Sequence, residues 1–287
     1  MRPRRYDAAL LLTKLSFSTA AGSRPRVHRA KRGYDRDVAV LLTKVRAPRR
    51  ADGSWAIVPA VTYYHHAASA LLDPGTPPLE APALERADRV DLGLPPGTRM
   101  ELACTERDEA AAADLFTRAR LDPGEPYAVL NPGGNNPAKR WAVERFAAIG
   151  DHLASAHGVR VFVAGSPAEA DLGRAIAERA SCAVAVLPDL GLTLGGLKAV
   201  LARARVLVTN DTGPRHIAAA FGTPVVSLFG PTDARWTTIP FEREAVVVAD
   251  PTLPADQSAN DHPDRCSIDR IEVGRVIEGV DGVLAGA

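Results

Sequence analysis

The sequence predicts an α/β protein whose C-terminal half is built on a parallel β-sheet covered by helices on both faces. Two observations carry this prediction. From Tyr127 onward, short apolar runs alternate with longer amphipathic stretches. The apolar runs lack a polar residue at every second position, which is typical of strands buried on both faces.

The elements expected in this half follow from apolar runs and helix end signals. Gly158 stands where a left-handed helix cap belongs, and Ser166-Pro167 combines an N-cap residue with proline at the first helical position. The expected strands cover residues 127–130, 159–164, 183–187, 206–209, 225–229 and 245–249. The expected helices cover residues 141–156, 166–180, 193–204 and 214–221, with a last one from about residue 271.

The first 120 residues show a weaker pattern. Apolar runs at 8–12 and 38–42 stand among Arg-rich and Pro-rich stretches, and the first of them is predicted to be a strand. We therefore expect a partial N-terminal domain over residues 1–120 and a complete C-terminal domain over residues 121–287.

Composition restricts the class of protein. Of 287 residues, 46% are hydrophobic, which is enough to form a substantial core, and the net charge of +1 provides no general attraction to nucleic acid. The three cysteines form no CxxC pair, so we expect a reducing, cytoplasmic location. No apolar run approaches the ~18 residues of a membrane span, and membrane contact is expected to be peripheral at most.

Three loops follow expected strands and would meet at the carboxyl edge of the sheet, where open parallel sheets bind ligands. The first, residues 131–141, contains two glycines that let a ligand approach the backbone, and ends in Lys139 and Arg140, which can neutralise phosphate. The third is residues 230–233. Taken alone, the first loop could also be an ordinary turn.

The second loop, residues 210–216, opens a helix. Arg215 and His216 in its first turn oppose the helix dipole, a cost that a bound anion would offset. Alternatively, Asp211 is only a helix cap and His216 a histidine satisfied by its neighbours. Together, the loops favour a diphosphate site.

The runs NPGGNNPAKRWAVERF (131–146) and NDTGPRHIAAAFGTPVVSLFGPT (210–232) resemble the signatures of the ADP-heptose:lipopolysaccharide heptosyltransferases, glycosyltransferase family 9. The resemblance extends from about residue 127 to the end and, more weakly, over residues 6–48. It implies a GT-B-like fold of two Rossmann-like doubly wound domains facing a cleft, of which the N-terminal one is incomplete here.

The resemblance also implies the chemistry. A heptose, or a related sugar, would pass from an ADP-linked donor to a lipopolysaccharide-type glycan or glycolipid, with inversion and without metal or cofactor. Lys139 would stabilise charge on the departing ADP, and Glu169 would accept hydrogen bonds from the ribose. The expected donor-binding residues are Asn131, Gly133, Gly134, Asn135, Glu169, Asp211, Thr212, Gly213 and His216.

The N-terminal region departs from the family pattern. The opening strand and helix units, with the loop that carries the family's catalytic aspartate, are not recognisable, so the general base is unknown. Asp7 and Asp35 have no spacing that makes either one a base, and both suit a solvated surface. His262 and Cys266 lack the second ligand pair of a zinc site.

Two other functions stay open at this stage. The chain could bind a nucleotide sugar with weak or no transfer activity. It could also be a sugar-nucleotide epimerase of similar architecture, which would need no acceptor.

Overall fold

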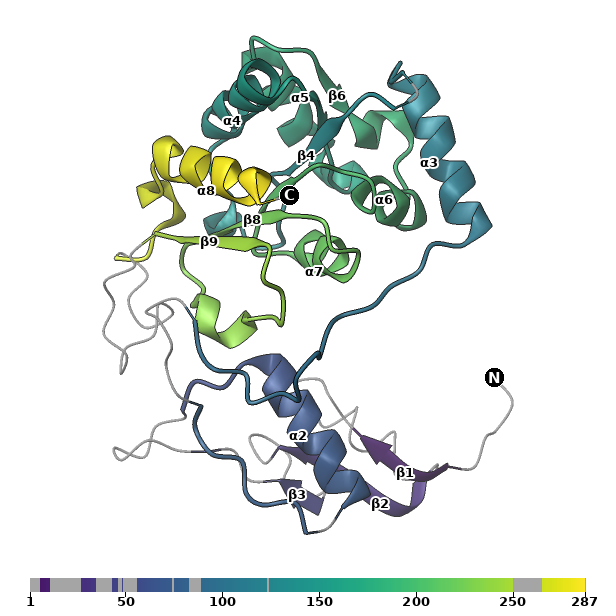
Figure 1. The fold of residues 1–287 in the computed structure, drawn as a ribbon, viewed down its shortest axis with the longest axis vertical. Helices are drawn as coiled ribbons and strands as arrows, with labels where there is room; N and C mark the ends of the chain where they lie inside the picture. The colour runs from purple at the N-terminus through teal and green to yellow at the C-terminus, as the bar shows by residue number, and fades with distance from the viewer. Residues whose placement is uncertain are drawn as a thin grey trace. The chain divides into compact units, whose positions relative to one another are not determined.

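The computed structural model describes residues 6–10, 27–34, 43–45, 48, 56–73, 75–82, 89–122, 124–249 and 265–286. These fall into two compact units (Figure 1). The first comprises residues 1–96 and 235–239, and the second comprises residues 97–234 and 240–287. The second unit therefore begins before residue 120, because a helix ahead of the first strand of its sheet packs within it.

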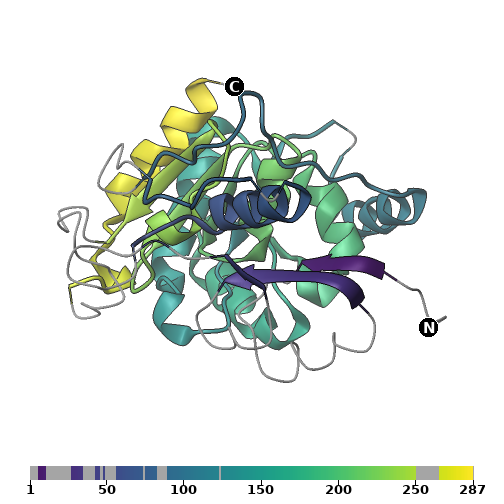
Figure 2. The same cartoon turned by 90° about the horizontal axis from the view of Figure 1, so that it is seen from below.

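The described part of the first unit contains a small parallel sheet. Its strands are β1 (Tyr6–Leu10), β2 (Val27–Tyr34) and β3 (Thr43–Val45), in the order β1-β2-β3. Helix α2 (Ala60–Leu72) packs beside β1 and β2 (Figure 2). The strand predicted at 8–12 is confirmed in β1 as far as Leu10, whereas the run at 38–42 lies outside the described residues.

The second unit contains a six-stranded parallel sheet in the order β6-β5-β4-β7-β8-β9. The predicted strands of this unit are all present, with ends that differ by one residue at most. They are β4 (Tyr127–Asn131), β5 (Arg160–Val163), β6 (Val184–Val186), β7 (Leu207–Asn210), β8 (Val225–Phe229) and β9 (Glu244–Val248). Counted from β4, this is the 3-2-1-4-5-6 order of a Rossmann-like domain, so the chain reverses direction across the sheet between β4 and β7.

Helices cover both faces of this sheet because its strands are apolar on both sides. Along β4, Ala128 and Leu130 enter one core, whereas Tyr127 and Val129 enter the other. The first core lies under α4 (Val143–His157), α5 (Ala170–Arg179) and α8 (Val273–Ala285). The second lies under α3 (Glu106–Arg118), α6 (Leu194–Leu201) and α7 (Gly213–Ala220).

Local signals explain where these helices begin and end. Gly158 adopts the expected left-handed cap at the end of α4, with φ of 62°. Ser166 forms a capping box with Glu169 ahead of α5. Helix α3 was not predicted, although Thr105 and Asp108 form a capping box at its start. Its many exposed positions weaken the apolar periodicity that a sequence pattern depends on.

Candidate functional site

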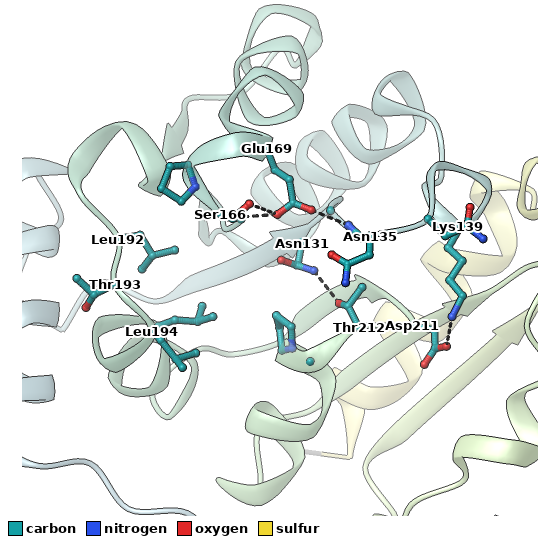
Figure 3. Close-up of a pocket in the computed structure, with 18 residues that line it drawn as sticks. Asn131, Asn135, Lys139, Ser166, Glu169, Leu192, Thr193, Leu194, Asp211 and Thr212 are labelled. Atoms are coloured by element: carbon teal, nitrogen blue, oxygen red, sulfur yellow. Dashed lines mark hydrogen bonds and ion pairs between the residues drawn. The ribbon is translucent and has the colours of Figure 1, made fainter. Parts of the chain in front are cut away.

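A cavity of about 540 Å³ lies at the carboxyl edge of the second unit's sheet, at the switch point between β4 and β7. This is where doubly wound sheets hold ligands, because the loops on either side of the switch point diverge. The cavity is lined by Asn131, Gly133, Gly134, Asn135, Asn136, Lys139, Gly165, Ser166, Pro167, Glu169, Leu192, Thr193, Leu194, Leu197, Asp211, Thr212, Gly213 and Pro214 (Figure 3). Lys139 and all of the expected donor-binding residues except His216 belong to this lining.

The loop after β4 is tied to the end of β7. The buried Asn210 donates from Nδ2 to the carbonyl of Pro132 (2.7 Å) and to that of Gly133 (3.2 Å). Asn131, also buried, donates to the hydroxyl of Thr212 at 3.0 Å. Because side chains from both strands cross the switch point, the two loops form one rigid rim. Asn210 was not predicted as a site residue, because its contribution depends on this contact across the sheet.

Glu169 holds the glycine loop from the opposite side. Its carboxylate accepts hydrogen bonds from the backbone N–H of Gly134 (2.8 Å) and from the N–H (2.9 Å) and hydroxyl (2.7 Å) of Ser166 (Figure 3). A Cβ placed on Gly133 would overlap the Glu169 carboxylate. A side chain at residue 133 would therefore force the Glu169 carboxylate out of its present position.

These contacts determine the charge of Glu169. Burial opposes ionisation and would raise the pKa of the carboxyl, but the hydrogen bonds from Ser166 and Gly134 and the nearby charge of Arg140 outweigh it, so the pKa of Glu169 is lowered. The side chain is therefore anionic at neutral pH. Arg140 also donates from Nε to the Gly134 carbonyl at 2.8 Å, so it fixes the loop, and its contact with phosphate stays a prediction.

Lys139 is the cation of the cavity. It ends a short 3₁₀ turn, Pro137–Lys139, and its Nζ lies 3.0 Å from Oδ2 of Asp211 (Figure 3). The Lys139 side chain is 28% exposed and that of Asp211 10%, so the ammonium faces the cavity from a partly desolvated position. The pair brings together the first and second predicted loops, which are 72 residues apart in sequence.

Helix α7 begins at the cavity with Gly213, where a Cβ would meet no protein atom within 4 Å. Arg215 turns inward instead. It is buried and forms a bidentate ion pair with Glu244, with distances of 2.6 and 3.0 Å. The interpretation that a bound anion offsets Arg215 was therefore wrong, because Glu244 on β9 offsets this charge.

His216 lies in the first turn of α7 but does not line the cavity. The residue keeps an exposed surface, whereas its ring is desolvated by neighbouring atoms. This desolvation and, next, the positive charge of Arg215 lower the imidazole pKa, and they outweigh the opposite effect of Asp211 and Glu244. At neutral pH the ring is therefore uncharged in the absence of a ligand.

One wall of the cavity was missed by sequence reasoning. Leu192 and Thr193 come from the connection between β6 and α6, and Leu194 and Leu197 come from the first turn of α6, where Leu194 is 70% exposed. This connection also follows a parallel strand, so its place at the carboxyl edge could have been inferred from the strand order. The third predicted loop, residues 230–233, does not line the cavity. Its Gly230 packs against Ile268, where a Cβ would lie 2.6 Å from the Ile268 nitrogen.

The chain matches a known family along most of its length. A family model described as glycosyltransferase family 9 (heptosyltransferase) matches residues 1–263. The chain belongs to glycosyltransferase family 9. The family predicted from the two sequence runs is thereby confirmed.

Curated relatives of this family 9 chain match somewhat less than half of its length. Lipopolysaccharide heptosyltransferase 1 of Pseudomonas aeruginosa is 37% identical over 119 residues, which are 42% of this chain and 33% of that protein. The enzyme of the same name from Escherichia coli K12 is 35% identical over 130 residues, 45% of this chain and 39% of that protein. The matched segment thus spans between a third and two fifths of the length of these relatives.

Solved structures share the fold of the family 9 chain. A family 9 glycosyltransferase from Veillonella parvula aligns with a TM-score of 0.72 and 19% identity over 99% of this chain and 75% of that one. Escherichia coli ADP-heptose lipopolysaccharide heptosyltransferase II aligns with a TM-score of 0.65 and 21% identity, covering 98% and 77%. An E. coli heptosyltransferase solved with ADP aligns with a TM-score of 0.58 and 21% identity, covering 99% and 76%. The predicted fold class, α/β and GT-B-like, is confirmed.

Among the described residues, no helix combines the length and apolar character required to cross a membrane. Of the residues considered as a base or a metal ligand, Asp35 and His262 lie outside the described residues.

Proposed function

We propose that this chain is a glycosyltransferase that moves a heptose, or a related sugar, from an ADP-linked donor to a lipopolysaccharide-type glycan. The transfer inverts the anomeric centre and needs no metal. The observation that carries the proposal is the cavity at the switch point, where a glycine loop, a helix N-terminus and Lys139 converge. Family membership and the ADP present in one solved relative support ADP as the leaving group.

Lys139 supplies the charge that this reaction requires. As the bond between the sugar and the diphosphate breaks, negative charge grows on the departing phosphate oxygens. A cation already held in place, here by Asp211 at 3.0 Å, lowers the energy of that charge without reorganisation of the protein. Asp211 then lies beside the donor, and the start of α7 at Thr212 and Gly213 faces the diphosphate.

The opposite end of the cavity suits the nucleoside. Glu169 accepts three hydrogen bonds from Ser166 and Gly134, and a carboxylate has about four acceptor positions, so one remains for a ribose hydroxyl. The exposed Leu194 offers an apolar surface to the base. In this arrangement the protein holds the ribose, the diphosphate and the sugar in order along the cavity.

Binding can be tested with two ligands that differ in charge. Titration calorimetry of the purified chain should show that Lys139→Ala weakens ADP binding by about tenfold or more, since a hydrogen bond to a charged group contributes about 1.5–3 kcal/mol. Adenosine affinity should stay the same, because adenosine carries no phosphate. Lys198→Ala, which removes an equal charge from a similarly buried pair with Asp108 outside the cavity lining, serves as the control. Equal losses for ADP and adenosine would refute the role of Lys139.

Transfer is tested separately with ADP-heptose and a lipopolysaccharide core that lacks the terminal heptose. Mass spectrometry should detect one added heptose, NMR should show the opposite anomeric configuration, and a chelator should not reduce the rate. Binding of ADP without transfer would instead favour the nucleotide-sugar-binding alternative. An isomerised donor formed without acceptor would favour the epimerase.

A further inference from the structure

A second cluster of side chains that could bind a ligand lies on helices α4 and α8. His152 and His157 of α4 converge on Asp281 of α8, with their Nε2 atoms 2.8 and 2.7 Å from the same carboxylate oxygen. The two imidazoles also contact each other, with ring centroids 5.4 Å apart in an edge-to-face arrangement. One ligand atom from each residue lies within 4.8 Å of the other two.

This arrangement differs from a chance surface ion pair. The histidine side chains are 21% and 25% exposed, and that of Asp281 is 49% exposed. The imidazoles are therefore largely held by packing, while one side of the cluster is open to solvent. Two fixed nitrogens and one carboxylate oxygen supply three ligands, and a water molecule can supply a fourth from the open side.

The distances suit a tetrahedral metal ion. Zinc binds histidine nitrogen at about 2.0–2.1 Å and carboxylate oxygen at about 2.0–2.2 Å, which places tetrahedral ligand atoms about 3.3 Å from one another. The two nitrogens are 2.8 and 2.7 Å from the Asp281 oxygen, so each separation needs to open by about half an ångström. Small side-chain rotations accomplish this change.

We propose that His152, His157 and Asp281 form a Zn²⁺ site that fastens α8 to α4. None of the three residues lines the cavity between β4 and β7, so the site is separate from the proposed donor site. The bound ion stabilises the contact between α4 and α8. The ion joins the last two turns of α4 to α8, two segments that are 129 residues apart at His152 and Asp281.

Zinc titration of the full, untagged chain tests this site. After treatment with a chelator and dialysis, calorimetry with ZnCl₂ should show one ion bound per chain. His152→Ala and His157→Ala should each weaken zinc binding at least tenfold. His65→Ala, on the exposed surface of α2, is the matched control and should leave zinc binding unchanged.

Stability provides a second measurement. Zinc at 100 times its Kd should raise Tm by about 5 °C or more, and EDTA should reverse the rise. If the alanine variants do not fold, Asp281→Asn and the X-ray absorption spectrum of the zinc-loaded wild-type chain replace them. The spectrum should show two imidazole nitrogens, oxygen ligands and no sulfur.

Three results would overturn the proposal. They are zinc affinity unchanged in both histidine variants, a sulfur ligand in the spectrum, and the lack of any zinc-dependent rise in Tm. The first two place the ion elsewhere in the chain. The third leaves His152, His157 and Asp281 as a hydrogen-bonded group that stabilises the helix contact without metal.

Discussion

The ion pair between Arg215 and Glu244 permits a quantitative prediction. The Arg215 side chain is 1% exposed and that of Glu244 is 0% exposed, and the carboxylate also accepts a hydrogen bond from Ser227 at 2.6 Å. The guanidinium carbon lies 5.1 Å from the centre of the Phe229 ring. Glu244→Gln removes the negative charge but leaves the shape almost unchanged, so it isolates the electrostatic part of this contact.

The expected loss of stability is large. Removing one partner of a buried ion pair costs about 3–5 kcal/mol, because the other charge stays buried without compensation. Domains of this kind have unfolding free energies of about 5–15 kcal/mol, so the variant should lose a substantial part of its stability. At about 2–4 °C per kcal/mol for a unit of this size, Tm should fall by roughly 6–20 °C.

Urea unfolding followed by circular dichroism measures the effect. The control is Glu101→Gln, which breaks the ion pair with Arg99. This pair is exposed, because the Arg99 side chain is 78% exposed and that of Glu101 is 69% exposed. That change should cost less than about 1 kcal/mol. The double variant Arg215→Met with Glu244→Leu should recover most of the loss, because no unpaired charge remains. A loss for Glu244→Gln no larger than that of the control would refute the reasoning.

Further predictions concern the cavity. Gly133→Ala should lower the unfolding free energy by about 1–3 kcal/mol and also lower ADP affinity, because the added Cβ would displace Glu169. Gly213→Ala should leave Tm unchanged but weaken ADP binding. Calorimetry and thermal melts of both variants would contradict this if ADP affinity were unchanged. The pKa of Glu169 is lowered, so its contribution to stability is present above its ordinary value of 4.5 and is lost as pH falls through the folded pKa. Urea unfolding from pH 7 to 3.5 should show wild type and Glu169→Gln converging at low pH, and a constant gap would count against it. The pKa of His216 is also lowered, so its ring is uncharged without a ligand. His216 does not line the cavity, but a diphosphate at the start of α7 that contacts this ring should make it take up a proton, and ADP affinity should then rise as pH falls from 8 to 6. Calorimetry should show a weaker pH dependence for His216→Ala, and identical profiles would exclude the contact.

The sequence by itself determined the architecture of the second unit. Strands buried on both faces must be apolar throughout, and helices between them carry cap residues such as Ser166 and Gly158, so both kinds of element are visible locally. The glycine loop after β4 and the loop before α7 could also be identified from the sequence. Glycine, proline and charged residues at the end of a strand indicate a loop without reference to the rest of the chain. The family followed from the same runs of residues.

Tertiary structure alone decided which side chains meet. Arg215 and His216 are neighbours in sequence, yet one turns into the core toward Glu244 while the other stays near the surface. The pairing of Lys139 with Asp211, the clamp of Glu169 on Gly134 and the meeting of two α4 histidines with Asp281 join segments that are far apart along the chain. A local pattern indicates the backbone conformation of one segment at a time. Strand order and helix packing determine which of these segments come into contact, and the chemistry of the site depends on that contact.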